Sequence, residues 1–151
     1  MQDYRRLLVW KKAHNHVLNV RDSTNRFPRS GYASLKLQLI KSSESIPFNI
    51  VEGCGARTQP EFARFLDVSI KSASETEYQL ELARDYSIMT LSEWEMLSGA
   101  TIEIRKMLCG LRKRVIEDDN EGRTAEWRAI SFQNSELSTQ FELSTEFLSL
   151  R

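Results

Sequence analysis

The 151-residue sequence contains few of the residues that build disulfide frameworks, metal sites or membrane spans. Its two cysteines, Cys54 and Cys109, are too few and too far apart to indicate a disulfide framework or a zinc site. No apolar run approaches the roughly 20 residues of a membrane-spanning helix. The N-terminus also lacks the apolar stretch of a signal peptide. We therefore expect a cytoplasmic protein with no membrane segment.

Groups that could carry catalysis are also scarce. The two histidines, His14 and His16, are two residues apart and project from a helix in different directions. No Glu-x-x-His pair is present, so a di-iron site of the kind found in helical bundles would lack its imidazoles. Neither cysteine has an identifiable base or orienting group nearby. We expect no metal, no cofactor, no small-molecule substrate and no enzymatic activity.

The formal net charge of zero conceals a strong asymmetry along the chain. Residues 1–30 contain seven Lys or Arg against two Asp or Glu, and residues 31–116 contain eleven of each. Residues 117–151 contain three Lys or Arg against eight Asp or Glu. A basic start and an acidic end favour interactions that depend on charge.

Hydrophobic residues recur every three or four positions in four segments, which predicts four helices. The segments cover residues 3–26, residues 32–53, a stretch that begins at Thr58 and a stretch that begins at Ser92. Thr58-Gln59-Pro60-Glu61 and Ser92-Glu93-Trp94-Glu95 have the pattern of helix-starting capping boxes. Four helices of similar length with short turns indicate an all-α, up-down-up-down four-helix bundle.

The composition changes after Ile116. Residues 117–151 are acidic and rich in Ser and Thr, and Glu-Leu-Ser-Thr occurs at residues 136–139 and again at residues 142–145. Such low-complexity sequence is typical of disorder. We expect a folded bundle over residues 1–116 and a disordered tail over residues 117–151, in which Trp127, Ile130 and Phe132 are candidates for transient docking on the bundle.

The stretch Ser-Glu-Ser-Ile-Pro-Phe-Asn-Ile-Val-Glu-Gly-Cys-Gly, residues 43–55, combines a helical pattern with Pro47. If the helix continues through it, the proline leaves the carbonyl of Ser43 without its helical donor. Gly53 and Gly55 then end the helix, since glycine tolerates the left-handed conformation. Asn49 and Glu52 are candidates for fixing register, with Arg57 as a partner for Glu52.

A second pair of acidic residues, Glu75 and Glu77, lies in the third segment. The two are two positions apart, and Glu77 is next to the core stripe. A buried carboxylate needs a cationic or hydrogen-bonding partner. We interpret these residues as determinants of helix register, with a ligand or RNA contact as the alternative.

These residues resemble the family of 23S rRNA intervening-sequence proteins, which are four-helix bundles. The family pattern Ser-Ile-Pro-x-Asn-Ile-x-Glu-Gly, followed by an arginine, is met here by Ser45, Ile46, Pro47, Asn49, Ile50, Glu52, Gly53 and Arg57. The resemblance covers about residues 4–115. It departs at Ser72-Ala73-Ser74, where the family often has Gly-Ser, and in the acidic tail.

The resemblance implies a small homo-oligomer without known catalysis and a role in RNA binding. The fold is also similar to that of the accessory protein of diversity-generating retroelements, a barrel-shaped homo-pentamer that binds nucleic acid. A homo-pentamer is therefore one expectation for this chain.

Two hypotheses of function remain open. In the first, cations on the neighbouring first and fourth helices bind the phosphates of RNA; the candidates are Arg5, Lys12, Arg26, Arg105, Lys106, Arg112 and Lys113. The alternative for these side chains is that they only solvate the surface. In the second, the protein is a homo-oligomeric scaffold or partner-binding module, with a second apolar stripe formed by Tyr4, Leu7, Leu8 and Leu18. The acidic tail would compete with RNA for the basic face.

Overall fold

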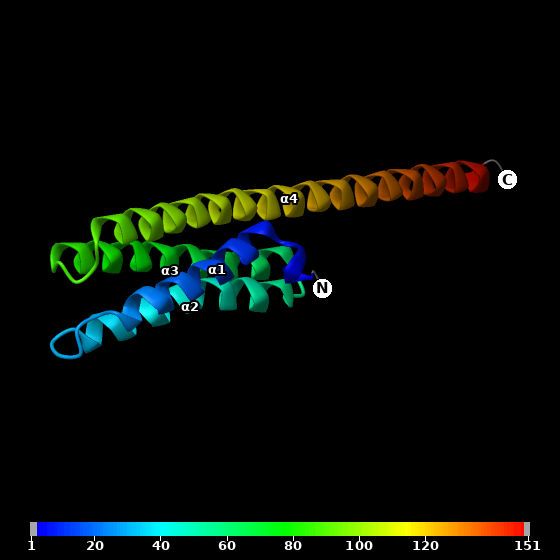
Figure 1. Ribbon diagram of the computed structural model, residues 1–151. Helices are drawn as coiled ribbons and strands as arrows, with labels where there is room; N and C mark the ends of the chain where they lie inside the picture. Colours follow the sequence, from blue (N-terminus) through cyan, green and yellow to red (C-terminus); the bar gives the residue numbers. More distant parts are fainter. Residues whose placement is uncertain (1–2, 150–151) are drawn as a thin grey trace. The chain divides into compact units, whose positions relative to one another are not determined.

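The computed structural model describes the backbone of residues 3–149 and the side chains of residues 3–122. It contains a short 3-10 helix, η1 (Tyr4–Arg6), and the helices α1 (Leu8–Asn25), α2 (Ala33–Cys54), α3 (Gln59–Asp85) and α4 (Leu91–Ser149) (Figure 1). Between residues 3 and 149 there is no strand, so the all-α prediction is confirmed. The chain divides into two compact units, residues 1–116 and residues 117–151.

In the first unit, contacts between side chains define a closed ring of neighbouring helices. Each helix contacts the next one along the chain, and the part of α4 up to residue 116 returns to α1. Representative pairs are Arg21–Glu44 for α1 and α2, Ser69–Ile46 for α2 and α3, Arg105–Glu77 for α3 and α4, and Lys12–Glu103 for α4 and α1. Consecutive helices run in opposite directions (Figure 1), as predicted for an up-down-up-down bundle.

Two apolar clusters fill the interior of this bundle. Towards the end that holds η1 and the α2–α3 turn, the first cluster is built around Val9, Ile46, Ile50, Leu66 and Leu108. Towards the other end, the second cluster contains Val20, Leu39, Leu80 and Leu97. Each cluster draws side chains from all four helices, which is the burial that makes the four amphipathic segments stable together.

A buried polar network joins α2 to α3 between the apolar layers. Thr76 donates to the hydroxyl of Ser42 over 2.9 Å, and Ser42 donates to Oε1 of Gln79 over 2.6 Å. Nearby, the hydroxyls of Ser45 and Ser72 lie 2.9 Å apart. Buried hydroxyls and amides that satisfy one another only in one alignment fix the register of the two helices.

The first predicted helix is interrupted near its start. The sequence pattern predicted one helix over residues 3–26, whereas the structure has η1, then Leu7 with extended backbone, then α1. Asp3 caps η1 by accepting a 3.0 Å hydrogen bond from the backbone N–H of Arg5. Tyr4 and Leu7 pack against the first apolar cluster, so burial of these two side chains accounts for the break.

The fourth helix begins one residue earlier than predicted and has a different cap. Thr90, not Ser92, accepts a 3.2 Å hydrogen bond from the N–H of Glu93, and Glu93 accepts a 3.1 Å bond from the N–H of Thr90. This is a reciprocal capping box. The prediction at Ser92 was wrong because Thr90 also heads an equivalent pattern, with a glutamate three residues later. At α3 the predicted cap is confirmed, since Thr58 accepts from the N–H of Glu61 over 3.3 Å.

The backbone of α4 continues as helix through Ser149, beyond the predicted change at residue 116. The docking of Trp127, Ile130 and Phe132 concerns side chains that lie outside the described residues, so it stays a prediction. The disorder expected for residues 117–151 also stays a prediction. None of the helices within the described part of the chain has the length and apolar content needed to cross a membrane.

Candidate nucleic-acid interface

Positive charge on α1 and on the part of α4 within the bundle is concentrated at one end of the bundle. Residues 3–16 and 101–116, which meet at the end of the bundle holding η1, contain nine Lys or Arg and two Asp or Glu. Residues 17–30 and 87–100, at the other end of the same two helices, contain three of each. The contacts Lys12–Glu103 and His16–Thr101 place the two basic segments beside each other. We call residues 3–16 and 101–116 the basic end.

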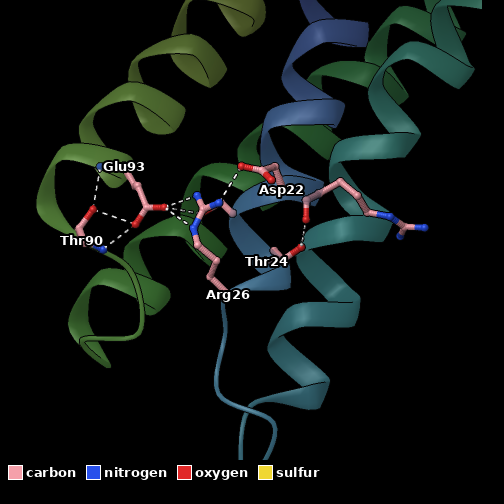
Figure 2. Close-up of polar contacts among 7 residues, drawn as sticks. Asp22, Thr24, Arg26, Thr90 and Glu93 are labelled. Carbon is pink, nitrogen blue, oxygen red and sulfur yellow. Dashed lines mark hydrogen bonds and ion pairs between the residues drawn. The ribbon is translucent and has the colours of Figure 1, made fainter.

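Of the seven cations predicted to bind nucleic acid, Arg26 lies away from the basic end. It follows α1 at the opposite end of the bundle and binds two carboxylates (Figure 2). Its Nη1 is 2.7 Å from Asp22, and its Nη2 is 2.5 Å from Oε1 of Glu93. Arg26 and Thr90 together lower the pKa of Glu93 to about 2, because both donate hydrogen bonds to the charged carboxylate. Arg26 therefore connects α1 to α4.

Three further candidates pair with carboxylates within the bundle. Lys12 lies 2.9 Å from Glu103, and Nε of Arg105 donates to Glu77 over 3.1 Å. Arg112 makes a two-point contact with Asp67, in which Nη2 lies 3.1 Å from Oδ2. The fork of an arginine and the two oxygens of a carboxylate match in this geometry, which holds α3 against α4. These cations are partly committed to the bundle itself.

The remaining candidates are exposed at the basic end. The guanidinium of Arg5 lies over the ring of Tyr4, 4.5 Å from its centroid, and 3.7 Å from Asp3. Lys106 and Lys113 are exposed on α4. Lys106 contacts no carboxylate in the part of the chain whose side chains are described. A phosphate reaching Lys106 would meet an uncompensated charge.

Sequence reasoning missed three exposed cations at the same end, namely Arg6, Lys11 and Arg114. None has a carboxylate partner among the described side chains. The signal for them is the local charge count: Arg114 follows Arg112 and Lys113 directly, and Arg6 and Lys11 flank the start of α1. The helical wheel shows only on which side of the helix a residue lies. It does not show at which end of the helix the residue lies, and the charge differs between the two ends.

The central motif has a structural role in the geometry. Ile46 is fully buried in the core, and Pro47 lies inside α2, which continues as helix around it. Asn49 donates to the carbonyl of Ser45 over 2.8 Å, and Ser69 donates to the carbonyl of Ile46 over 3.0 Å. These two bonds reinforce the helical turn around Pro47 and tie it to α3; neither reaches the carbonyl of Ser43, which is the one that Pro47 leaves without its helical donor.

Gly53 is required for close packing and not for a left-handed turn. The predicted left-handed conformation is absent at Gly53 and Gly55; among the described glycines only Gly31 has a positive φ, of 88°. A Cβ at position 53 would lie 2.7 Å from Cδ2 of Phe62 and 2.9 Å from Cβ of Phe65. The prediction failed because it assigned to chain reversal a glycine that the α2–α3 contact needs.

Glu52, Glu75 and Glu77 were predicted to have partners that fix helix register. The one specific pair that was predicted, Glu52 with Arg57, is not formed. Glu52 is exposed and forms no ion pair with Arg57 in the described part; the backbone N–H of Arg57 instead donates to Glu61 over 2.9 Å. Glu77 is half-buried and binds Arg105, whereas Glu75 is exposed and accepts a 3.3 Å bond from Gln79. Each of these two carboxylates therefore has a partner within the bundle.

The cysteine and histidine side chains that could act as nucleophiles, bases or metal ligands do not form a reactive site among the described residues. Cys54 is buried, and burial raises the pKa of its thiol, which disfavours the reactive thiolate. His16 is buried against Thr101, and burial lowers its pKa to about 4. His14 stacks on Trp10 with ring centroids 5.3 Å apart. Among the described residues, no three His, Cys, Asp or Glu side chains gather as metal ligands would.

These features define a small helical-bundle protein in which several cations pair with carboxylates of neighbouring helices and an excess of positive charge lies at one end. A family model described as 23S rRNA-intervening sequence protein matches residues 5–110. The chain therefore belongs to the 23S rRNA-intervening sequence protein family, which confirms the resemblance.

A solved structure supports the same assignment. It is the crystal structure, at 1.70 Å resolution, of a protein with unknown function from the S23 ribosomal protein family of Bacteroides thetaiotaomicron VPI-5482. This chain is 26% identical to it, with a TM-score of 0.66, and the alignment covers 70% of this chain and 99% of that one. A search of curated proteins gives no match.

Proposed function

We propose that the protein is a non-catalytic, homo-oligomeric RNA-binding protein and that its basic end contacts RNA phosphates. The observation that carries this proposal is the excess of nine Lys or Arg over two Asp or Glu in residues 3–16 and 101–116. Such an excess raises the local potential and attracts a polyanion. The name of the family links its members to intervening sequences of 23S rRNA, and we extend that association to this chain.

Structured RNA is the form of nucleic acid that suits this surface. The aromatic side chains at the basic end contact one another: Tyr4 meets Trp10 edge to face, with centroids 4.7 Å and planes 63° apart, and Trp10 stacks on His14. Because these three rings pack into one cluster, they do not form the row of separate open rings on which successive unpaired bases stack. Exposed lysines and arginines suit the phosphates of a folded RNA, which proteins recognise largely by backbone and shape.

The test is RNA affinity as a function of salt. The full chain would be titrated into a fluorescent structured RNA that carries a 23S rRNA stem, at 50 mM and 200 mM salt, with anisotropy as the readout. The triple variant Lys11→Gln/Lys106→Gln/Arg114→Gln removes three exposed cations of the basic end. If each contacts one phosphate, the salt slope falls by roughly 2 to 3.

The matched control removes three cations elsewhere. Arg29→Gln/Lys36→Gln/Lys71→Gln changes the net charge equally but spares the basic end. It is expected to weaken binding less than the first triple variant. Absence of RNA binding by the wild-type protein at 50 mM salt would refute the proposal, and equal loss in the two triple variants would reduce it to non-specific attraction.

A different observation favours the second candidate function, a homo-oligomeric scaffold. Four large apolar side chains on α1 and α2 are exposed: Leu8 by 60%, Leu18 by 56%, Leu37 by 51% and Phe48 by 64%. Leu8 and Leu18 belong to the stripe predicted on the first helix, whereas its other two members, Tyr4 and Leu7, pack against the core. A protein that assembles without binding RNA would show a mass above 17.5 kDa and no anisotropy change.

A further inference from the structure

A groove lies between α2 and α3, at the end of the bundle away from η1. Its volume of about 710 Å³ falls within the roughly 300–1,000 Å³ of clefts that bind ligands in proteins. Three tyrosines line it, namely Tyr32 directly before α2, Tyr78 on α3 and Tyr86 directly after α3. Tyr78 is 60% exposed and Tyr86 is 52% exposed, so both rings are accessible to a ligand.

The polar groups of this groove have few partners within the protein. In the part of the chain whose side chains are described, none of the three tyrosine hydroxyls forms a hydrogen bond, and neither do the side chains of Ser34 and Gln38. Tyr32 and Tyr86 contact each other through their rings, whose centroids are 6.0 Å apart and whose planes meet at 40°. The groove therefore presents hydrogen-bond donors and acceptors beside aromatic surface.

Glu75 is the one charged side chain that lines this groove among the described residues. Its Oε1 accepts a 3.3 Å hydrogen bond from Gln79, and Oε1 of Gln79 accepts a 2.6 Å bond from Ser42 in the buried network of α2 and α3. The network thus positions the carboxylate. Within residues 3–122 no Lys or Arg pairs with Glu75, so its second oxygen is available to a cation of a ligand.

The lining residues of α3 follow one side of that helix. Glu75, Tyr78, Leu82 and Tyr86 are separated by three, four and four residues, and the eleven steps from the first to the last rise by about 16 Å. A polyproline II segment rises about 3.1 Å per residue, so about five of its residues cover this length. Such a segment has no internal hydrogen bonds. Tyrosine hydroxyls and the amide of Gln38 can donate to its carbonyls.

We propose that this groove binds an extended, proline-rich segment of another protein that carries one arginine. The guanidinium of that arginine donates to the carboxylate of Glu75 and lies over the ring of Tyr78. Prolines about four to five residues further along the segment pack on the rings of Tyr32 and Tyr86. The inference goes beyond the proposed function and does not depend on it, because the basic end lies on η1, α1 and α4 and the groove lies between α2 and α3.

The chemistry of the groove selects this occupant. A single uncompensated carboxylate beside a ring favours a cation, and arginine fits best because its flat guanidinium stacks on a ring and still donates to a carboxylate. The protein contains two such stacked contacts of its own: Arg5 lies over Tyr4 and Arg84 over Trp94, each with 4.5 Å from the guanidinium carbon to the ring centroid. A helical partner would satisfy its own carbonyls and would leave the open hydroxyls of the groove unused.

The first experiment measures, by anisotropy, how the full chain binds a fluorescent peptide of one arginine followed by five prolines. Saturable binding is expected, and a peptide with glutamate in place of the arginine is expected to bind about tenfold more weakly. Glu75→Gln keeps an acceptor for Gln79 but removes the charge, and it should also lose about tenfold. Glu81→Gln is the matched control, because Glu81 is exposed on the same helix and lies outside the groove. Equal affinity for the two peptides, or equal loss in the two variants, would overturn the proposal.

The second experiment removes aromatic surface from the groove. Tyr78→Ser is expected to weaken binding of the arginine peptide by about two- to fivefold, because the stacked contact is lost. Val68→Ser is the matched control, since Val68 is 43% exposed on the same helix and lies outside the groove, and it should leave the affinity unchanged. Unchanged affinity in Tyr78→Ser, with its helical circular dichroism intact, contradicts the placement of the arginine.

A charge exchange tests the pairing itself. Glu75→Lys is expected to prefer the glutamate peptide over the arginine peptide, which reverses the preference of the wild type. Absence of binding of the arginine peptide by the wild type overturns the proposal. If, in addition, the mass in solution falls in Tyr78→Ser, a second copy of the chain occupies the groove instead. Failure of the wild type to bind RNA leaves the peptide result unaffected, so the proposed function and this inference fail separately.

Discussion

Arg26, at the end of α1, and Glu93, in the first turn of α4, are joined by two hydrogen bonds to the same carboxylate oxygen. Nη2 of Arg26 lies 2.5 Å from Oε1 of Glu93, and Nε lies 3.2 Å from it. The other oxygen of Glu93 accepts from the hydroxyl of Thr90 over 2.8 Å (Figure 2). One side chain therefore caps α4 and ties α4 to α1, 67 residues away in the sequence.

Loss of this contact on acidification is the first prediction. The pKa of Glu93 is about 2 in the folded protein, against an ordinary value of 4.5. The lowered pKa stabilises the fold above pH 4.5, and the contribution disappears as the pH falls from there through 2. Glu93→Gln is expected to lower the melting temperature at pH 7 and to lose less on going from pH 5 to pH 2 than the wild type.

Thermal unfolding followed by circular dichroism measures this difference. Glu95→Gln, two residues further along and exposed, is the control that keeps the wild-type acid dependence. An unchanged loss of melting temperature between pH 5 and pH 2 in Glu93→Gln would show that the contact contributes nothing to folding.

Capping by Thr90 gives a second prediction. Thr90→Ala removes the acceptor for the N–H of Glu93 and a donor to its carboxylate. We expect a loss of roughly 1 kcal/mol in the free energy of unfolding. Ser92→Ala is the matched control, since Ser92 lies inside the helix and exposed. Urea denaturation measures both, and a larger effect at Ser92 would restore the cap predicted from the sequence.

The wrong prediction of Ser92 as the cap of α4 shows which features of the fold the sequence alone cannot determine. Periodicity predicts four helices and their order because the core stripes of Val9, Leu39, Leu66 and Leu97 repeat at helical spacing. A capping motif is shorter, and Thr90 and Ser92 both head a pattern with a glutamate three residues later. In the structure Glu93 closes the box with Thr90 and also binds Arg26, and that second contact depends on how α1 packs against α4.

The same limit applies to the candidate site. The sequence identifies six of the nine cations of the basic end, but not the carboxylates that Lys12, Arg105 and Arg112 bind. Those partners come from other helices, between 28 and 91 residues away, so their identity depends on packing register. Glu52 and Arg57 illustrate the converse, since proximity in sequence suggested a pair that the turn does not form.

Close packing at Gly53 gives a third prediction. A Cβ at this position would lie 2.7 Å from the ring of Phe62, so Gly53→Ala forces α2 and α3 apart or moves the ring. We expect a loss of about 1–3 kcal/mol. Gly99→Ala is the control: nothing lies within 4 Å of its added Cβ, and alanine is expected to stabilise α4 by about 0.5–1 kcal/mol. Denaturation of both variants in urea decides whether Gly53 is needed for packing.

Buried His16 gives a fourth prediction. Its pKa is about 4 in the folded protein against an ordinary 6.5, because burial disfavours the charged ring. The unfolded chain takes up a proton below pH 6.5 and the folded chain does so only near pH 4, so stability falls as the pH drops across this window. The shift corresponds to roughly 3 kcal/mol at its full extent.

His16→Leu is expected to flatten the dependence of unfolding free energy on pH between 6.5 and 4. Thr101 keeps its 2.8 Å bond to the carbonyl of Leu97 in that variant, so its hydroxyl stays satisfied. His14→Gln, at an exposed position two residues away, serves as the control and retains the dependence. A slope in His16→Leu equal to that of the wild type would contradict burial of a neutral histidine.

The acidic tail provides the last prediction. Residues 117–151 contain eight Asp or Glu and three Lys or Arg, whereas residues 3–16 and 101–116 contain nine Lys or Arg and two Asp or Glu. If the tail competes with RNA for the basic end, deletion of residues 117–151 tightens RNA binding at 50 mM salt, and the gain shrinks at 200 mM as screening increases. A full-length variant with Glu117, Asp118, Asp119 and Glu121 changed to glutamine or asparagine separates charge from length. It should reproduce most of the gain, whereas equal affinity of all three proteins at low salt would count against competition.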